Sequence, residues 1–280
     1  MEDNARILMA VAAFFVLVLA FFGGLIWGTR KAVPGRVQWS TANLLYALCL
    51  LLLTVRSSVP AWIGVVGANT FVVGATILAL EGTRAFRGLR PRIWAAYLGG
   101  GLAILAVVYF TYISNNLNAR ASVLSLFMGS VAALCSITLL KGMPSGNRLG
   151  MVYTGAMFAL SAAVQIARAI YFHFASPMTD SGMFATPWAN AANLGTALSI
   201  ASCSIGWRVL SNERLLDSMA GRVAAADAGK SQFVKLMSHE IRNPLSGIKA
   251  VADLLLDTSL TQEQQEMMLE RAARSKTRSG

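Results

Sequence analysis

A succession of long apolar runs limits what this chain can fold into more than any other feature. From Ile7 to about Leu210, these runs alternate with short polar connections. Each run is near the roughly 20 residues that a helix needs to cross a bilayer, where only helices and closed barrels satisfy their backbone hydrogen bonds. We therefore predict seven membrane-spanning helices, at residues 7–28, 40–56, 59–80, 93–113, 121–140, 149–174 and 186–208.

The composition favours the same interpretation. Hydrophobic residues make up 55% of the 280 residues and charged residues only 13%, which is too apolar for an ordinary soluble protein. After Leu210 the composition changes to that of a soluble helix. The predicted fold class is all-α, with a seven-helix transmembrane bundle followed by a cytoplasmic coiled-coil helix and a truncated two-helix hairpin.

The basic residues indicate the orientation of the predicted bundle. An odd number of spans puts the two ends of the chain on opposite sides of the membrane. The connections after spans one, three and five carry nine basic residues: Arg30, Lys31, Arg36, Arg84, Arg87, Arg90, Arg92, Lys141 and Arg148. The N-terminal tail and the other connections carry Arg6, Arg56 and Arg120, together with Glu2, Asp3 and Asp180. Positive charge collects on the cytoplasmic side, so we expect the N-terminus outside and the C-terminus in the cytoplasm.

The basic residues of these connections also account for much of the net charge of +11. Much of it forms the predicted cytoplasmic rim, where anionic lipid headgroups supply the counter-charge, so the lipid bilayer is the expected partner and nucleic acid is not. The cysteines Cys49, Cys135 and Cys203 occur singly in three predicted spans and form no CxxC pair. We expect buried thiols, with no disulfide and no metal site.

Polar residues within the predicted spans are candidate sites, because they are costly in a bilayer. They are Asn69, Gln165, Arg168, Asn190 and Asn193. Two interpretations of Arg168 remain open. Its side chain could extend to the outer headgroups, or it could line an outward-facing pocket for an anionic or polar signal together with Gln165 and His173.

The segment after Asn212 predicts a coiled coil. Its seam advances in steps of three and four along Leu216, Met219, Val223, Ala226, Lys230, Phe233, Met237, Ile241, Leu245, Ile248, Ala252 and Leu255. Two consecutive steps of four, from Phe233 to Met237 to Ile241, form a stutter that locally unwinds a supercoil.

His239 is one of only two histidines in the chain, and it is predicted to point away from this seam. It lies two residues from both Met237 and Ile241, or about 200° around a helix from each. Pro244 cannot donate a hydrogen bond to the carbonyl of Glu240, which loosens the helix at the histidine. A neutral imidazole is a nucleophile, and Glu240 is placed to hold its tautomer or accept its proton, so the pair suits phosphoryl transfer.

The segment KSQFVKLMSHEIRNPLSGIKAVADLLLDTSLTQEQQEMM, at residues 230–268, resembles the dimerisation and histidine-phosphotransfer domain of sensor histidine kinases, particularly hybrid kinases. The resemblance implies that His239 is the phosphoacceptor and Glu240 its acid/base partner. It also implies that Asn243 orients water for dephosphorylation of the cognate regulator, and that Pro244 bends the helix.

The motif DTSLTQEQQ predicts the turn of a hairpin, and Thr261 with Gln264 forms a capping box at the start of a second helix. Two such helices per chain would form a four-helix bundle in a homodimer. We divide the chain into a membrane sensor domain (1–210), a signalling helix (211–230) and a truncated phosphoacceptor domain (231–280).

The 41 residues from 240 to 280 leave no room for the ATP-binding domain that the resemblance implies. ATP and Mg²⁺ are therefore expected only for a missing catalytic domain, with no cofactor in this chain, and the chain alone is not expected to transfer phosphate from ATP. A natural truncation, a frameshift and a fragment remain open as explanations.

The predicted function is that of a sensor histidine kinase in a bacterial inner membrane. His239 would pass phosphate to an aspartate of a response-regulator receiver domain in a two-component phosphorelay. One alternative is a catalytically silent receptor that pairs with intact kinases or is phosphorylated by them in trans. Another is a small-solute carrier with a vestigial tail. The sequence indicates neither the signal nor the cognate regulator.

Overall fold

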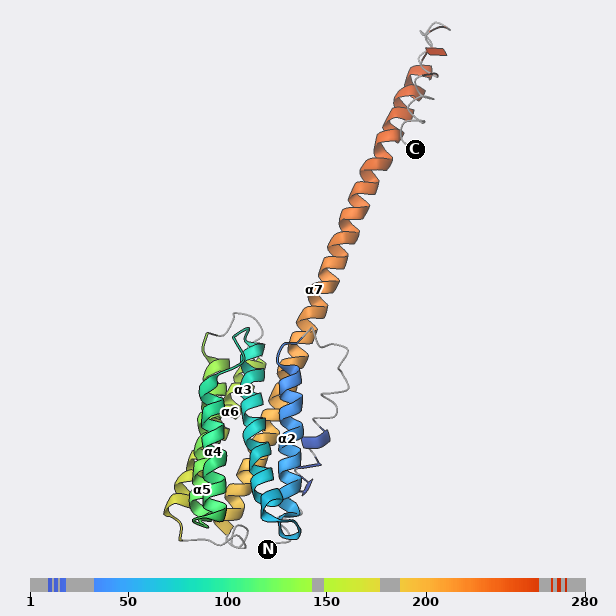
Figure 1. The fold of residues 1–280 in the computed structure, drawn as a ribbon. Coiled ribbons are helices and arrows are strands. Elements are labelled where there is room, and N and C mark those ends of the chain that lie inside the picture. Colours follow the sequence, from blue (N-terminus) through green and yellow to red (C-terminus); the bar gives the residue numbers. More distant parts are fainter. Residues whose placement is uncertain are drawn as a thin grey trace. The chain divides into compact units, whose positions relative to one another are not determined.

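The computed structural model describes residues 33–142, 149–176 and 187–256, together with isolated positions between residues 10 and 18 and between residues 263 and 270. In these ranges the chain is helical between short turns (Figure 1). The elements are α2 (Arg36–Thr54), the 3₁₀ turn η2 (Arg56–Ser58), the π-helical turn η3 (Trp62–Gly67), α3 (Ala68–Phe86), α4 (Trp94–Tyr112), α5 (Leu117–Leu140), α6 (Leu149–Phe174) and α7 (Pro187–Leu256). The all-α prediction is confirmed for these residues.

Five of the described helices are long and apolar enough to cross a membrane. They are Arg36–Thr54, Trp62–Phe86, Trp94–Tyr112, Leu117–Leu140 and Leu149–Phe174, and they correspond to the second to sixth predicted spans. Most of the first predicted span, 7–28, lies outside the described residues. The seventh, 186–208, falls in α7, which is not among the five. The count of seven therefore stays a prediction.

The first part of α7 carries polar side chains that lower its hydropathy, yet it packs against the other helices. Asn193, Ser199 and Ser204 are buried there. Apolar side chains of the same segment belong to the hydrophobic core: Ala197, Ile200, Cys203, Trp207 and Leu210. The polar groups face neighbouring helices, so the mean hydropathy of the segment understates its fit to a bundle interior.

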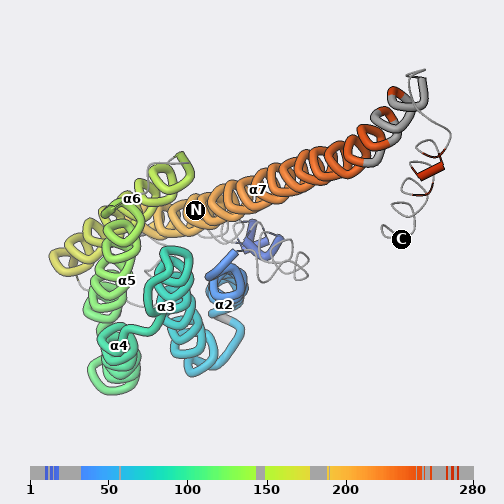
Figure 2. The backbone as a smooth tube through the Cα atoms, turned by 90° about the horizontal axis from the view of Figure 1, so that it is seen from above, coloured from blue at the N-terminus to red at the C-terminus, as the bar shows by residue number. Residues whose placement is uncertain are grey.

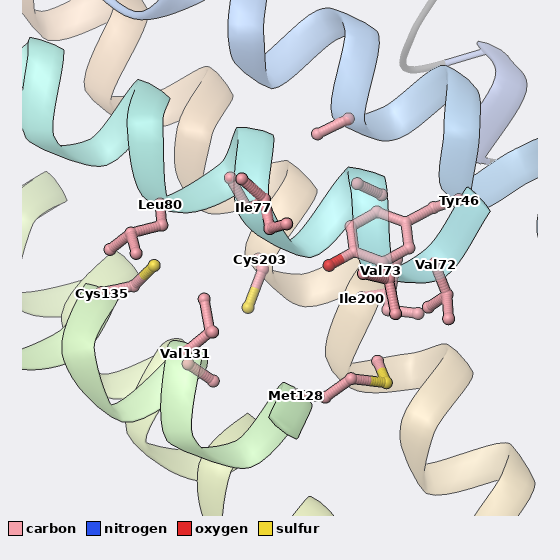
Figure 3. Close-up of a cluster of buried hydrophobic side chains, with 14 of the residues drawn as sticks. Tyr46, Val72, Val73, Ile77, Leu80, Met128, Val131, Cys135, Ile200 and Cys203 are labelled. Carbon is pink, nitrogen blue, oxygen red and sulfur yellow. The ribbon is translucent and has the colours of Figure 1, made fainter. Parts of the chain in front are cut away.

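The core of the bundle lies around α3, which packs against α2, α4 and α5 (Figure 2). Figure 3 shows side chains from α2, α3, α5 and α7 meeting in the interior, with the thiols of Cys135 and Cys203 among them. Cys49 is also buried, and all three thiols are free, which confirms the prediction of buried thiols. The helix α4 buries few residues, and most of its apolar surface faces outward.

Buried polar contacts tie pairs of helices together. The Ser204 hydroxyl on α7 donates to Asn43 Oδ1 on α2 at 2.8 Å. The Ser136 hydroxyl on α5 donates to the Gly155 carbonyl on α6 at 2.8 Å. Within a bilayer, each such hydrogen bond between helices contributes on average about 0.6 kcal/mol to stability. The value is small because the same polar groups also find hydrogen-bond partners when the helices are apart. These contacts fix which faces of the helices meet.

The chain forms two compact units, Met1–Asp217 and Ser218–Gly280, and α7 contributes residues to both. Near the end of the first unit, the backbone N–H of Gly150 donates to Glu213 Oε1 at 3.0 Å, so Glu213 satisfies an N–H at the start of α6. The guanidinium of Arg214 lies 4.9 Å from the centre of the Phe86 ring, at the end of α3. These two residues attach α7 to the ends of α6 and α3. The predicted domain boundaries at 210 and 230 stay predictions.

Candidate phosphoacceptor site

The helix α7 carries the predicted phosphoacceptor segment. Residues 231–243 contain neither Gly nor Pro and include one each of the good helix formers Lys, Leu, Met, Glu and Arg, which is compatible with the helical backbone. The helix continues through Pro244 to Leu256. The proline therefore does not end the helix, although it lacks the N–H that would otherwise bond the carbonyl of Glu240 and its ring crowds that carbonyl.

The predicted coiled-coil seam is exposed to solvent along this helix. Exposed fractions are 63% for Phe233, 39% for Met237, 52% for Ile241 and 56% for Leu245. Earlier seam residues are similarly exposed: Leu216, Met219 and Val223. Large apolar side chains at steps of three and four form a stripe that is interrupted at Ala226 and Lys230, and such a stripe is the kind of surface that a partner helix covers.

His239, Glu240 and Asn243 are all exposed on α7. His239 and Asn243 are four residues apart, so they share one face of the helix. That face lies roughly opposite the seam, because two residues correspond to about 200° of rotation. Glu240 lies about 100° from His239 and borders both faces. The imidazole is thus open to an incoming group while the apolar stripe remains free to pack.

The hairpin turn and the capping box of Thr261 and Gln264 lie outside the described residues. Of the predicted pair of helices, the structure describes the first, which lies within α7.

The structure also locates the polar residues of the membrane part. Arg168 on α6 donates through Nη1 to Ser125 Oγ at 2.7 Å and through Nη2 to Asn193 Oδ1 at 3.2 Å. Its guanidinium lies 5.2 Å from the centre of the Phe172 ring. The arginine is therefore bonded to α5 and α7 within the bundle, and it lines a cavity there.

One of the two interpretations predicted that Gln165 and His173 would line a pocket together with Arg168. Neither residue lines that cavity. Gln165 is 1% exposed and donates to Thr196 Oγ1 at 3.4 Å. His173 is exposed, and its ring is nearly perpendicular to the ring of Phe174. His173 is five residues from Arg168, or about 140° around α6, so it lies on another face of the helix. Gln165 is only about 60° from Arg168, but its amide is directed to Thr196 and it does not line the cavity.

Two further arginines line the cavity, and the sequence analysis did not connect them with Arg168. Arg56 and Arg120 had been assigned to outer connections, but both are lining residues. A signal was present, because each lies near the end of a predicted span on the same side of the membrane as Arg168. Which spans adjoin one another was not visible in the sequence.

Residues 229–278 match the His Kinase A (phospho-acceptor) domain. The chain is also similar to known histidine kinases. It is 43% identical over 53 residues to Probable histidine kinase 4 of Oryza sativa subsp. japonica, covering 19% of this chain and 5% of that protein. It is 54% identical over 41 residues to Hybrid signal transduction histidine kinase A of Dictyostelium discoideum, covering 15% of this chain and 2% of that protein.

A further relative matches a longer stretch, as Probable histidine kinase 5 of Oryza sativa subsp. japonica is 30% identical over 93 residues, or 30% of this chain and 8% of that protein. The chain thus spans less than a tenth of the length of these curated relatives. No solved structure matches the chain.

These similarities define one segment of the chain. Residues 229–278 match a histidine-kinase phospho-acceptor domain, as the SHEIRNPL motif indicated, and the relatives that the chain resembles are histidine kinases, one of them a hybrid kinase. His239 lies within the matched residues, on the exposed helix α7.

Proposed function

We propose that this chain is a membrane-bound receptor of a two-component phosphorelay in which His239 is the phosphoacceptor. The observation that carries the proposal is the phospho-acceptor match over residues 229–278, with His239 exposed opposite an apolar stripe. An acceptor must meet a phosphate donor and then a receiver domain, so it needs an open face. The same helix must also bind a partner helix, so it needs an apolar face as well.

The proposed chemistry uses the residues of one helix. A ring nitrogen of His239 attacks the γ-phosphorus of ATP, an N–P bond forms, and the bond to the oxygen of the leaving ADP breaks. Glu240 holds the ring tautomer that leaves the attacking nitrogen unprotonated, or takes up the proton that the ring releases. An aspartate oxygen of a receiver domain then attacks the same phosphorus, and the N–P bond breaks. Asn243 is proposed to orient water for the later hydrolysis of that aspartyl phosphate.

A homodimer would cover the apolar stripe. Phe233, Met237, Ile241 and Leu245 recur at steps of four, and a second copy of the same helix presents the same pattern. We propose that the two copies pair along this seam and form half of a four-helix bundle each. His239 would then lie on the outer surface of the bundle.

The membrane part would act as the sensor. Five helices could cross a bilayer, and nine basic residues cluster in alternate connections, which supports a cytoplasmic phosphoacceptor. The similar kinases come from plants and Dictyostelium, so a bacterial membrane stays a prediction from the sequence. Glu213 and Arg214 attach α7 to α6 and α3, and we propose that movement of the bundle reaches the phosphoacceptor helix through these contacts.

The test uses the full chain in lipid nanodiscs, with a separately produced histidine-kinase ATP-binding domain, Mg²⁺ and radiolabelled ATP. Label on the wild-type chain that chases to a receiver domain, and that is absent from His239→Gln, is the expected result. Asn243→Ala should still be labelled at His239 but should lose much of its ability to promote dephosphorylation of the receiver. A chain that takes label but never passes it to any receiver would favour the silent receptor over the relay kinase.

A further inference from the structure

The cavity beside Arg168 lies between helices of the membrane part, and its lining is unusual in charge. Its lining includes residues of α2, α3, α5, α6 and α7, and its volume is about 80 Å³. A site of this size holds on the order of five waters, or a small anionic group with a few carbon atoms.

Three arginine residues line this one cavity. Arg56 follows α2, Arg120 lies in the first turn of α5, and Arg168 lies near the end of α6. None of the described residues that line the cavity is acidic. Cations in a poorly hydrated interior repel one another and favour an anion between them, and arginine is the side chain best suited to a carboxylate or phosphate.

The hydrogen bonds of Arg168 do not neutralise its charge. Its two terminal nitrogens donate to the neutral groups of Ser125 and Asn193. Its Nε is buried and has no hydrogen-bond partner among the described residues. A buried N–H without an acceptor is costly, and it adds to the cost of holding the Arg168 cation away from water.

The rest of the lining is largely apolar. Tyr46, Met128 and Ile200, which Figure 3 shows together in the interior, line this cavity and also a second one of about 30 Å³. An anionic group at the arginines would therefore have an apolar surface beside it for a short hydrocarbon part.

We propose that this cavity binds an anionic ligand, a carboxylate or phosphate group with a small apolar body, and that this ligand is the signal. This inference rests on the proposed receptor function. Asn193 and Thr196 belong to both the cavity and α7, the helix that carries His239, so a ligand that engages Arg168 acts directly on that helix. The same chemistry could come from a free anion or from the headgroup of an anionic lipid.

Binding is measured on the full chain in phosphatidylcholine nanodiscs without ATP, so the result does not depend on phosphotransfer. The probes are butyrate, inorganic phosphate and butylammonium. Butylammonium has four carbon atoms, as butyrate does, and carries the opposite charge. Butyrate or phosphate should bind saturably and raise the unfolding temperature, and butylammonium should not. A third arm replaces phosphatidylcholine with phosphatidylglycerol and follows the unfolding temperature.

Two cavity variants and one control locate the site. Arg168→Gln and Arg56→Gln should each weaken binding roughly tenfold or more, because each removes a charged donor. Arg84→Gln is the control, since Arg84 donates to the Arg90 carbonyl and does not line the cavity. An effect of phosphatidylglycerol alone that Arg168→Gln abolishes would identify the lipid headgroup as the occupant. The proposal is overturned if no anionic probe binds, if butyrate and butylammonium bind equally, or if Arg84→Gln weakens binding as much as the cavity variants do.

Discussion

Ile241→Ala tests whether the exposed stripe on α7 is a dimer seam. Ile241 is 52% exposed in the single chain, and the substitution removes most of its apolar side chain. Complete burial of such a side chain is worth about 1.5–3 kcal/mol, so burying its exposed half contributes about 1 kcal/mol per chain. Two chains lose about 2 kcal/mol together, which weakens dimerisation about 30-fold at 1.4 kcal/mol per tenfold.

Leu236→Ala is the matched control. Leu236 is 58% exposed, nearly the same as Ile241, but lies about 140° away from it around the helix and off the seam. The assay mixes donor-labelled and acceptor-labelled full chains in detergent and measures energy transfer as the protein is diluted. Ile241→Ala should shift the midpoint about 30-fold and Leu236→Ala very little. Equal shifts, or no shift for Ile241→Ala, would refute the assignment of the seam.

Four other predictions follow from single contacts. Gly206→Ala should destabilise the bundle by about 1–3 kcal/mol, because the added Cβ would lie 2.8 Å from Thr154 Oγ1, whereas Gly221→Ala meets nothing within 4 Å and should stabilise α7 slightly; thermal unfolding compares the two. Glu213→Gln should cost about 0.5–1 kcal/mol in the same assay, because it removes the carboxylate charge at the start of α6, and an unchanged unfolding temperature would argue against the cap. Cys49, Cys135 and Cys203 should resist maleimide until the chain is unfolded in detergent, and rapid labelling of the native protein would contradict their burial. Glu240→Gln should slow phosphorylation of the chain by about 100-fold or more, measured as the initial rate of labelling, if Glu240 handles the ring proton.

Periodicity predicted the elements that depend on a single helix. The stripe through Phe233, Met237 and Ile241 was visible in the sequence because its spacing reports one helix face whatever lies around it. The second to sixth spans were also predictable from one segment at a time, because an apolar run of about 20 residues has the length that a helix needs to cross a bilayer.

Hydropathy placed some helix ends wrongly because it counts a charged residue as a boundary. The third span was predicted to end at residue 80, but the helix continues to Phe86. Glu81 is buried and accepts a hydrogen bond from the Tyr97 hydroxyl on α4, so it is accommodated inside the bundle. Because Tyr97 on α4 supplies a hydrogen bond to Glu81, the helix α3 can continue past this charged residue inside the bundle.

The cavity could not be predicted for a related reason. Arg56, Arg120 and Arg168 come from three separate segments, and their meeting depends on which helices are neighbours. The composition of a single segment does not indicate which other helices it packs against. Sequence reasoning therefore recognised Arg168 as costly and left its partners unidentified.

The most direct test of the central claim is to locate the phosphoryl group on the chain. After phosphorylation of the full chain by a separate ATP-binding domain, trypsin should release the peptide LMSHEIR, residues 236–242, which contains both His239 and Ser238. Mass spectrometry should find the phosphoryl group on His239, lost in acid and retained in alkali, with no phosphopeptide from His239→Gln. A phosphoryl group that is stable in acid and lies on Ser238, or one that persists in His239→Gln, would contradict the assignment of His239 as the acceptor.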